Sequence, residues 1–360
     1  MADQLAAVGA HEVAVVVLSY NGLHELRHFL PSVVAHSHLT RPGWQATVWV
    51  VDNASTDGTW AAVAAEFPTV CRHRIEVNHG FAGGYIESLP HIAADLYVLI
   101  NADVAVTPHW LEPLVDAFVA DPLLMAAQPK ILSQRQPTHF EYSGAGGGYL
   151  DYLGYPFCRG RLFFELEPDE GQYDDAREVF WASGACMAIR HTAYHGAGGF
   201  DPTFYAHMEE IDLCWRLKNQ GYRVGYVPQS VVYHVGGHII RYGSPAKMYY
   251  NYRNGLAMLV KNLRGRGWWR TVVLRMVLDG ISGVRSLLRG RPQDTWAILR
   301  AHAHFYRRLP ATLGARRRLI TDERRRNATP NLTGLYRRSL VWQYFGRKVA
   351  RSTDLPGLQQ

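Results

Sequence analysis

The chain has few cysteines and no long apolar run. Its four cysteines are far apart and form no CxxC pair: Cys71, Cys158, Cys186 and Cys214. This spacing excludes a zinc ribbon and a disulfide framework, and it is typical of proteins from a reducing compartment. No run of about 18 apolar residues occurs, so we expect no helix that spans a bilayer. The N-terminus also lacks a basic segment followed by a long apolar stretch, so we expect no signal peptide.

The glycine fingerprints of the common nucleotide-binding enzymes are missing too. No early strand leads into GxGxxG or GxxxxGK(S/T), which disfavours dinucleotide oxidoreductases and P-loop enzymes. The chain instead places Gly80, Gly83 and Gly84 in one short segment, which we interpret as a glycine-rich turn. Such a turn lets a ligand approach the backbone closely, or it simply needs a positive φ.

Acidic side chains are scarce in the C-terminal part, although the whole chain has a net charge of only +7. Residues 264–360 hold 21 Lys and Arg against five Asp and Glu, whereas residues 1–263 hold 17 against 26. The C-terminal region should therefore meet an anionic partner or surface. Nucleic acid is disfavoured as that partner, because no recognised nucleic-acid-binding motif accompanies the arginines.

A helix is expected over Trp268–Leu288, and a helical wheel divides its side chains into two halves. One half contains Arg270, Arg275, Asp279 and Arg285, and apolar side chains fill the other. Two interpretations stay open. The apolar half inserts into an anionic membrane, or it packs on the rest of the protein and leaves a solvated basic face.

The N-terminal part of the chain alternates apolar strands with polar loops and helices. We expect strands over 13–18, 47–51, 74–77 and 96–100, and helices over 23–36 and 59–66. This alternation predicts an α/β fold with a mostly parallel central sheet. Polar residues that follow the strands should meet at the carboxyl edge of that sheet, where ligands bind.

Later segments are less regular. Residues 143–161, rich in Gly and Tyr, are expected to form a long loop of the kind that serves as a lid or binding element. An apolar segment covers 180–190, strand-like alternation covers 221–232, and helical patterns begin at residue 247. A further helix is expected over 294–309, closed by Pro310. We therefore separate an α/β domain over 1–245 from a helical, basic C-terminal region over 246–360.

Polar side chains at the predicted strand ends suggest a ligand site. Asp52 could accept a hydrogen bond from a base or a ribose, although an Asx-turn that caps the next helix explains it equally well. Asn101 and Asp103 follow a buried strand, and such side chains suit a hard divalent cation that also binds substrate phosphates. His234, at another strand end, could add a nitrogen ligand.

An acidic cluster near residue 210 is the other candidate for chemistry. Glu209, Glu210 and Asp212 lie within four residues, and Arg216 follows one helical turn later. On a helix, Glu209, Asp212 and Arg216 would share a face, whereas Glu210 would point elsewhere. Acids at a helix start also suit the helix dipole, so a charged N-terminal turn is the simpler alternative.

Short motifs occur in a fixed order over roughly residues 12–260. They read VVVLSYNG, VVDNASTDGT, NHGFAGG, VLINADV, FWASGACMAIR, GGFD, FYAHMEEIDLCWRLKNQGY and VVYHVGG. Together they resemble the motifs of the family 2 glycosyltransferases. The resemblance implies a GT-A fold, a nucleotide-binding α/β sandwich, for the catalytic domain over 1–245. It also implies inverting sugar transfer from a nucleoside-diphosphate sugar, UDP- or dTDP-linked.

The resemblance implies a role for each strand-end motif. The nucleobase end would be bound by Ser19, Tyr20, Asn21 and Asp52. The ribose and diphosphate side would be lined by Asn78, Gly80, Gly83, Asn101 and Ala102. The donor sugar or the acceptor would face Trp181, Ser183 and Gly184.

The same resemblance implies which residues bind the metal ion and which residue is the general base. Asp103 stands at the family's Asp-x-Asp motif and would hold Mg²⁺ or Mn²⁺, with His234 completing metal or diphosphate binding. Asn101 replaces the first acid of that motif, which weakens a two-carboxylate site. Glu210 falls on the usual position of the general base, and Glu209 is the less favoured candidate. Asp212, in the same catalytic motif, would hold the helix by pairing with Arg216.

We therefore expect a glycosyltransferase that adds one sugar to a glycan or polyprenyl-linked acceptor in cell-surface polysaccharide synthesis. A processive synthase is disfavoured, because spanning helices and a QxxRW motif are missing. Two alternatives remain: a sugar-nucleotide pyrophosphorylase, and a non-catalytic nucleotide-sugar-binding protein. The expected location is the cytoplasm, with peripheral association at the inner face of the cell membrane; a homo-oligomer stays open.

Overall fold

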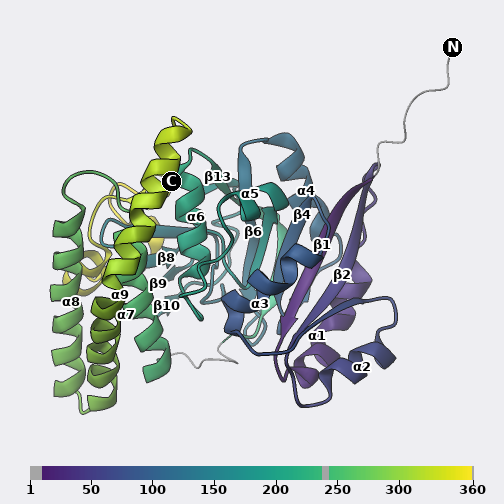
Figure 1. The fold of residues 1–360 in the computed structure, drawn as a ribbon, viewed down its shortest axis with the longest axis horizontal. Helices are drawn as coiled ribbons and strands as arrows, with labels where there is room; N and C mark the ends of the chain where they lie inside the picture. The colour runs from purple at the N-terminus through teal and green to yellow at the C-terminus, as the bar shows by residue number, and fades with distance from the viewer. Residues whose placement is uncertain (1–9, 237–242, 359–360) are drawn as a thin grey trace.

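The computed structural model describes residues 10–236 and 243–358. A central sheet with helices on both faces forms one side of the molecule, and a layer of long helices stands beside it (Figure 1). The expectation about a signal peptide concerns the first nine residues, which lie outside the described part. Within the described part, no helix is long and apolar enough to cross a bilayer.

The N-terminal half of the sheet is parallel, which confirms the prediction. Its strands are β1 (His11–Ser19), β2 (Trp44–Asn53), β3 (Cys71–Ile75) and β4 (Leu96–Asn101). The helices between them are α1 (Leu23–His36), α2 (Thr59–Glu66) and α3 (Gly80–Ser88), followed by the short turn Leu89–His91. The strands lie in the order β4-β1-β2-β3, and every neighbouring pair is parallel.

Alternate residues of β1 pack on opposite faces of the sheet. Val13, Val15 and Val17 belong to the core formed with α1 and α4 (Leu111–Ala120). Ala14 and Val16 belong to the core formed with α3 on the other face. Successive side chains of a strand point to opposite faces, so a strand buried on both faces is apolar throughout. Both faces of the sheet are thus covered, and a ligand can approach it at the ends of the strands.

The other half of the sheet mixes strand directions. β12 (Cys186–Arg190) runs antiparallel between β4 and β6 (Leu124–Ser133), and β6 is parallel to β13 (Arg223–His234). The short strands β5 (Val104–Val106) and β11 (Arg177–Val179) pair antiparallel with β13. The apolar patterns over 180–190 and 221–232 therefore contribute β12 and β13.

The prediction of a long loop over 143–161 is wrong. This segment starts a second sheet of β7 (Gly148–Asp151), β8 (Pro156–Cys158), β9 (Arg161–Leu162), β10 (Glu165–Leu166) and, from the C-terminal end, β14 (Leu335–Tyr336). A Cβ added at Gly148 would overlap the Trp181 ring. The glycines therefore serve close packing between short strands, which carry too few residues to show a strand periodicity.

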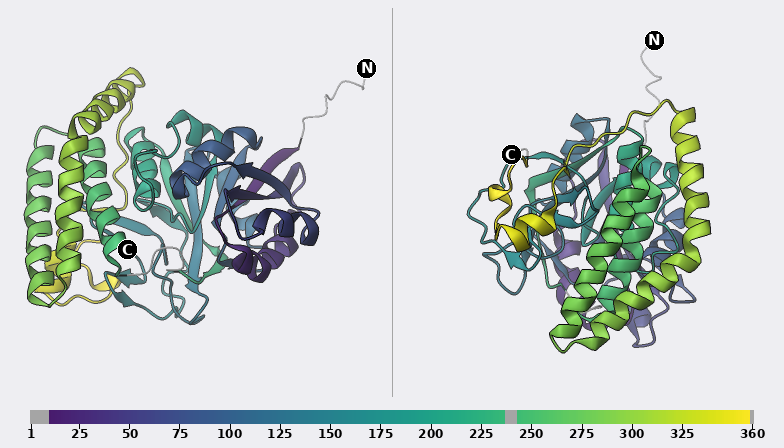
Figure 2. Two further views of the ribbon diagram at one scale, coloured as in Figure 1. Left: turned by 60° about the horizontal axis from the view of Figure 1, so that its bottom comes forward. Right: turned by 90° about the vertical axis from the view of Figure 1, so that its left-hand side faces the viewer.

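The helices after β12 form the rest of the molecule. They are α5 (His191–Gly196), α6 (Glu209–Asn219), α7 (Pro245–Asn262), α8 (Trp268–Leu288) and α9 (Pro292–Arg325), followed by single turns at Trp342–Gly346 and Ser352–Asp354. The predicted helix end at Pro310 is wrong, because α9 continues to Arg325 and changes direction part-way along (Figure 2). A proline removes one backbone hydrogen bond, which kinks a helix without ending it when the flanking turns pack well. Whether the residues after 245 form a separate domain stays a prediction.

Helix α8 turns two side chains of its charged half, Arg275 and Asp279, towards the protein, whereas Arg270 and Arg285 are exposed. Arg275 and Asp279 are buried and pair at 2.8 Å, and the Arg275 guanidinium lies 3.8 Å from the centroid of the Tyr155 ring. Apolar side chains of the other half, such as Val277 and Ile281, are exposed. The interpretation of a packed apolar half with a solvated basic face is therefore wrong for these side chains.

Candidate active site

The carboxyl ends of the parallel strands meet at one edge of the sheet. Ser19 at the end of β1 is in register with Asp52 on β2, and Leu18 is in register with Asn101 on β4. Asp52 is also in register with Arg74 on β3. The strand-end residues singled out in the sequence are therefore neighbours, because parallel strands end at the same edge.

Asp52 lies fully buried at this edge and keeps one oxygen without a hydrogen bond. Its Oδ1 accepts a 3.0 Å hydrogen bond from the Ser55 amide, whereas its Oδ2 has no partner among the described residues. The Arg74 Nε is 3.6 Å from that Oδ2. A buried acceptor without a partner is costly, so Oδ2 is a suitable acceptor for the N–H of a ligand.

The loop after β1 is fixed to the loop after β2. The Asn21 amide donates to Ser55 Oγ at 2.9 Å, and Asn21 Oδ1 accepts from the Thr56 amide at 2.8 Å. Tyr20, next to Asn21, is 48% exposed, while Ser19 is buried. Tyr20 is thus the side chain of this loop that a planar ligand could stack on.

The glycine-rich segment is not a turn but the first part of α3, so that prediction is wrong. Gly80 has a φ of 74° and starts the helix, where a Cβ would lie 2.6 Å from the Tyr205 ring. Within the helix, a Cβ on Gly83 would meet the side chain of His79 at 2.5 Å. Asn78 orients this start, because its Oδ1 accepts from the Gly80 amide at 2.8 Å and from Asn53 Nδ2 at 3.1 Å.

His234 connects the end of β13 to the Asn101-Ala102-Asp103 segment. Its Nε2 lies 3.2 Å from Asp103 Oδ1 and 3.3 Å from Asn101 Nδ2, and its Nδ1 lies 3.1 Å from Glu141 Oε2. Burial disfavours the charged ring, but the carboxylates of Glu141 and Asp103 outweigh it and raise the pKa of His234 to about 10. The ring is therefore an imidazolium between two carboxylates.

This donor set fits a divalent cation that is shared with a substrate. Asp103 offers one oxygen at the sheet edge, and His234 offers a nitrogen there once a bound cation displaces the proton from its Nε2. No group of three or more His, Cys, Asp or Glu side chains within 10–236 and 243–358 could hold a metal ion. The remaining positions would come from water and phosphate oxygens, as Mg²⁺ prefers.

The acidic cluster follows a strained turn at the start of α6. His207 and Met208 both have left-handed backbone conformations, with φ of 67° and 72°. Non-glycine residues rarely adopt this region, and such strain persists only where the surroundings enforce it. The turn delivers Glu209 and Glu210 to the N-terminus of the helix.

Both glutamates are enclosed and lack partners for one oxygen each. Glu209 Oε2 and Glu210 Oε2 are buried and accept no hydrogen bond from the described residues. Burial raises the pKa of Glu209 well above its usual value, and the neighbouring Glu210 adds to this rise. Burial also raises the pKa of Glu210, against backbone N–H groups and Lys247 that lower it. Raised carboxyl pKa values suit groups that accept protons near neutral pH.

Asp212 is used within the protein. Its Oδ2 accepts from Arg216 Nε and Lys261 Nζ, both at 2.9 Å, and its Oδ1 accepts from Asn262 Nδ2 at 2.8 Å. Lys261 also pairs with Asp201. Asp212 therefore joins α6 to α7, and both of its oxygens accept hydrogen bonds within the protein.

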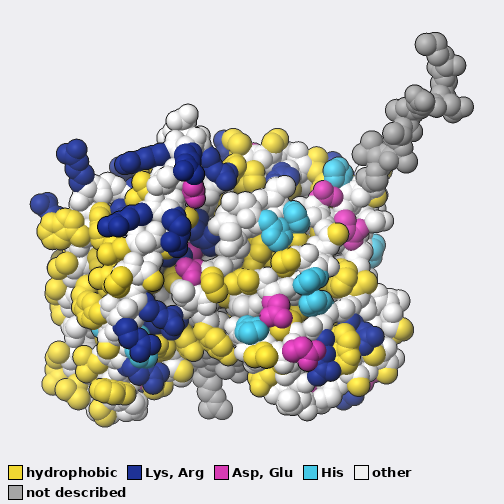
Figure 3. Space-filling model, in the orientation of Figure 1, with side chains coloured by type: hydrophobic (Ala, Val, Ile, Leu, Met, Phe, Trp, Pro, Cys, Tyr) yellow, Lys and Arg dark blue, Asp and Glu magenta, His cyan; other side chains and the backbone are white. Residues whose placement is uncertain are grey.

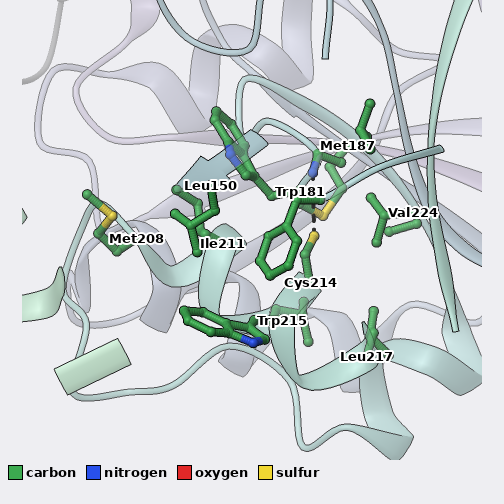
Figure 4. Close-up of a cluster of buried hydrophobic side chains, with 14 of the residues drawn as sticks. Leu150, Trp181, Met187, Met208, Ile211, Cys214, Trp215, Leu217 and Val224 are labelled. Atoms are coloured by element: carbon green, nitrogen blue, oxygen red, sulfur yellow. Dashed lines mark hydrogen bonds between the residues drawn. The ribbon is translucent and has the colours of Figure 1, made fainter. Parts of the chain in front are cut away.

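Of the segment 181–184, Gly184 borders Glu210. Trp181 is buried and donates from Nε1 to the Tyr149 carbonyl at 2.8 Å, and Ser183 donates from Oγ to the Ser143 carbonyl at 2.7 Å. A Cβ on Gly184 would lie 3.8 Å from Glu210 Cβ. Figure 4 shows Trp181 beside Leu150 in the buried cluster that also contains Ile211, Cys214 and Trp215 of α6.

The motifs and this geometry agree with the comparison to known families. Residues 10–252 match the model described as glycosyltransferase like family 2. The chain belongs to glycosyltransferase family 2. This membership makes it a glycosyltransferase and disfavours the two alternatives, a sugar-nucleotide pyrophosphorylase and a non-catalytic binding protein.

Relatives of this family 2 glycosyltransferase include two rhamnosyltransferases. It is 30% identical over 300 residues to the N-acetylglucosaminyl-diphospho-decaprenol L-rhamnosyltransferase of Mycobacterium tuberculosis, which covers 77% of this chain and 92% of the relative. It is 37% identical over 71 residues to the rhamnosyltransferase WbbL of Escherichia coli, which covers 20% of this chain and 26% of the relative. The structure of GalNAc-T7 with UDP, GalNAc and Mn²⁺ matches with a TM-score of 0.53 at 16% identity and covers 71% of this chain and 48% of that chain. This likeness shows the GT-A fold.

Three residues near the candidate site of this family 2 glycosyltransferase were not singled out from the sequence. Glu141 faces His234 from an irregular segment, which carries no periodic signal. Lys247 lies in the first turn of α7, and burial lowers its pKa to about 8 against the nearby carboxylates of Glu141 and Glu210. Asn254 binds the strained turn before α6. The Ser244-Pro245 pair is a helix-start signal that could have drawn attention to Lys247.

Proposed function

We propose that this family 2 glycosyltransferase moves a hexosyl or deoxyhexosyl group from a UDP- or dTDP-linked sugar to a hydroxyl of a polyprenyl-linked glycan, with inversion. The name of the Mycobacterium tuberculosis relative, which covers most of both chains, supports a lipid-linked acceptor and L-rhamnose as the first donor sugar to test. Membership of the family supports the sugar-transfer reaction itself. The product would enter cell-surface polysaccharide synthesis, with the enzyme at the inner face of the cell membrane.

The observation that carries the proposal is the position of Glu210. Glu210 lies at the N-terminus of α6, beside Gly184. One oxygen of its carboxylate is buried and has no hydrogen bond among the described residues. A sugar hydroxyl is a weak nucleophile at neutral pH, so a positioned carboxylate must accept its proton as the new bond forms. The raised pKa of Glu210, caused by burial, makes it a stronger base than an exposed glutamate.

The nucleotide-sugar donor would bind at the carboxyl edge of the sheet. Asp52 and Tyr20 would hold the nucleobase, and Asn78 with the start of α3 would face the ribose and the diphosphate. Asp103 and His234 would hold Mg²⁺ or Mn²⁺, which stabilises the negative charge of the leaving diphosphate. His234 is kept in place for this role by its contact with Glu141.

The test is the Glu210→Gln variant, assayed with a panel of UDP- and dTDP-linked sugars that includes dTDP-L-rhamnose. We expect transfer to fall by about 10²- to 10⁴-fold, because Gln cannot accept the proton, while donor binding measured by calorimetry is retained. Glu170→Gln, an exchange of an exposed glutamate, is the matched control and should keep full activity. An active Glu210→Gln variant would contradict the assignment of the base. A loss of transfer in Glu209→Gln alone would move the role to Glu209.

A further inference from the structure

The outward side of α8 is an apolar face on the solvent side of the helical layer. Its members share a helical stripe and are between 50% and 82% exposed: Trp269, Val273, Val277, Ile281, Val284 and Leu288. Figure 3 shows hydrophobic side chains gathered over α8, with Lys and Arg side chains nearby. Soluble proteins rarely expose so many apolar side chains contiguously, so such a face marks an interaction site.

The apolar face extends onto α9. Trp296, Leu299 and Tyr306 are also exposed there. Tyr306 Oη lies 4.0 Å from Met276 Sδ of α8, so the exposed side of α9 adjoins that of α8. Trp and Tyr combine an apolar ring with a polar group, which favours the boundary between lipid headgroups and acyl chains.

The charged side chains around this face have one sign. Between Trp268 and Arg291, the exposed charged residues are Arg270, Arg285, Arg289 and Arg291. The two acids between Trp268 and Asp294 are withdrawn from solvent: Asp279 pairs with Arg275, and Asp294 is buried beside Arg291. The surface that surrounds the apolar face therefore presents arginines.

We propose that the apolar face of α8 and α9 docks on an anionic lipid bilayer. Apolar side chains on one stripe with arginines beside them are what an interfacial helix needs, because the former enter the acyl boundary and the latter bind anionic headgroups. A second copy of the chain is a poorer occupant. A two-fold contact through this face would bring arginines against arginines, since such an interface uses the same patch on both subunits.

The docked surface reaches towards the active site. The Arg285 guanidinium lies 4.8 Å from the Phe345 ring centroid, and Phe345 lies 5.1 Å from Phe163 at the β9–β10 turn. Phe164 at the same turn is exposed. On the inner side of this hairpin, Arg161 covers the Tyr142 ring, next to Glu141. Resting on the proposed function, this arrangement would bring a polyprenyl-linked acceptor from the bilayer to the edge that holds Glu141.

The test is flotation of the full chain with phosphatidylcholine vesicles that contain or lack phosphatidylglycerol. We expect the protein to float with the anionic vesicles and to be released by high salt. Val277→Glu/Ile281→Glu should reduce flotation by at least about tenfold, because two apolar side chains leave the acyl boundary. The matched control is Val119→Glu/Leu123→Glu, which makes the same change at exposed apolar residues near α4 and should float like the wild type.

Thermal unfolding of both double variants checks that they fold. Equal flotation of the two variants would overturn the proposal, as would a wild-type chain that does not float. Light scattering would show whether the wild type is a dimer. If it is a dimer that Val277→Glu/Ile281→Glu disrupts, and if it does not bind vesicles, the face docks on a second copy of the chain instead of a bilayer. Glu210→Gln should float normally, so a failure of the proposed reaction is distinguished from a failure of docking.

Discussion

The side-chain amide of Asn254 in α7 donates a 2.7 Å hydrogen bond to the His207 carbonyl. The same amide donates to the Ala206 carbonyl at 2.9 Å, and Arg253 Nη2 donates to the Thr203 carbonyl at 3.0 Å. These bonds hold the backbone just before the left-handed residues His207 and Met208. Helix α7 thereby supports the turn that positions the two glutamates at the start of α6.

Asn254→Asp should weaken this support of the turn without changing substrate binding. Aspartate has the same shape but donates no hydrogen bond, so both carbonyls lose their partner and face a carboxylate. We expect kcat to fall by about 10- to 100-fold, since small misplacements of a catalytic group are costly, while KM for the donor stays nearly constant. Steady-state kinetics measure kcat and KM separately. Asn251→Asp on the same helix is the control, and an equal loss there would refute the role of Asn254.

The pKa of Glu209 predicts how stability depends on pH. Burial and the neighbouring Glu210 raise this pKa, so between the unfolded and folded values the folded chain binds more protons. The free energy of unfolding therefore falls as pH rises through that window. Glu209→Gln removes this dependence. At pH values above the window it should raise the free energy of unfolding by about 1.4 kcal/mol per unit of pKa shift, and the Tm should rise with it. The gain should shrink towards acid pH in calorimetric scans; a constant gain would contradict the cause.

The same substitution should change the pH profile of the reaction. Removing the charge of Glu209 removes a repulsion that disfavours ionised Glu210, because the interaction between the two carboxylates is mutual. We expect the acid limb of kcat/KM to move to lower pH in Glu209→Gln. An acid limb that stays in place would mean that Glu210 does not control it.

The sequence predicted the parallel half of the fold and the strand-end residues well, and for a physical reason. Continuous apolar strands such as β1 carry an unambiguous signal, and the parallel topology then fixes where Ser19, Asp52 and Asn101 lie. The second sheet was missed because its strands are too short to show a period.

Glu141 and Asn254 were missed because each acts through a contact distant in sequence, with His234 and with His207. The wheel of α8 separated Arg275 and Asp279 from the exposed Val277, but it grouped the exposed Arg270 and Arg285 with the buried pair. A wheel also contains no information about which face meets the protein. That was decided by the buried partners of Arg275, which are Asp279 and the Tyr155 ring.

The unpaired oxygen of Asp52 predicts a binding defect without a folding defect. In Asp52→Asn, the Oδ1 that accepts from the Ser55 amide is kept, whereas the charge offered to a ligand is lost. We expect UDP and dTDP to bind about tenfold or more weakly, as for one hydrogen bond to a charged group, with little change in Tm. Asp116→Asn on α4, which pairs with Arg41 at the surface, is the control. Unchanged nucleotide affinity would exclude Asp52 from the site.

The amide of Asn101 predicts a gain of metal affinity on substitution. Asn101 Nδ2 lies 3.3 Å from His234 Nε2, so a carboxylate at this position would stand beside Asp103 and His234. Asn101→Asp should lower the Mn²⁺ concentration for half-maximal nucleotide binding severalfold, because carboxylates are preferred ligands of hard cations. Chelation with EDTA should abolish metal-dependent nucleotide binding in both forms. If Mn²⁺ changes neither affinity, the cation site is wrongly placed.

The buried pair of α8 predicts that losing one partner is worse than losing both. Asp279 accepts from Arg275 Nε at 2.8 Å and lies 3.2 Å from His302 of α9, and it is completely buried. Arg275→Met would leave this carboxylate without its main partner and should cost about 3–5 kcal/mol of unfolding free energy. Arg275→Met/Asp279→Leu removes both charges and should recover most of the loss, as measured by urea unfolding. If the double variant is as unstable as the single one, the pair acts through packing on Tyr155 rather than through charge.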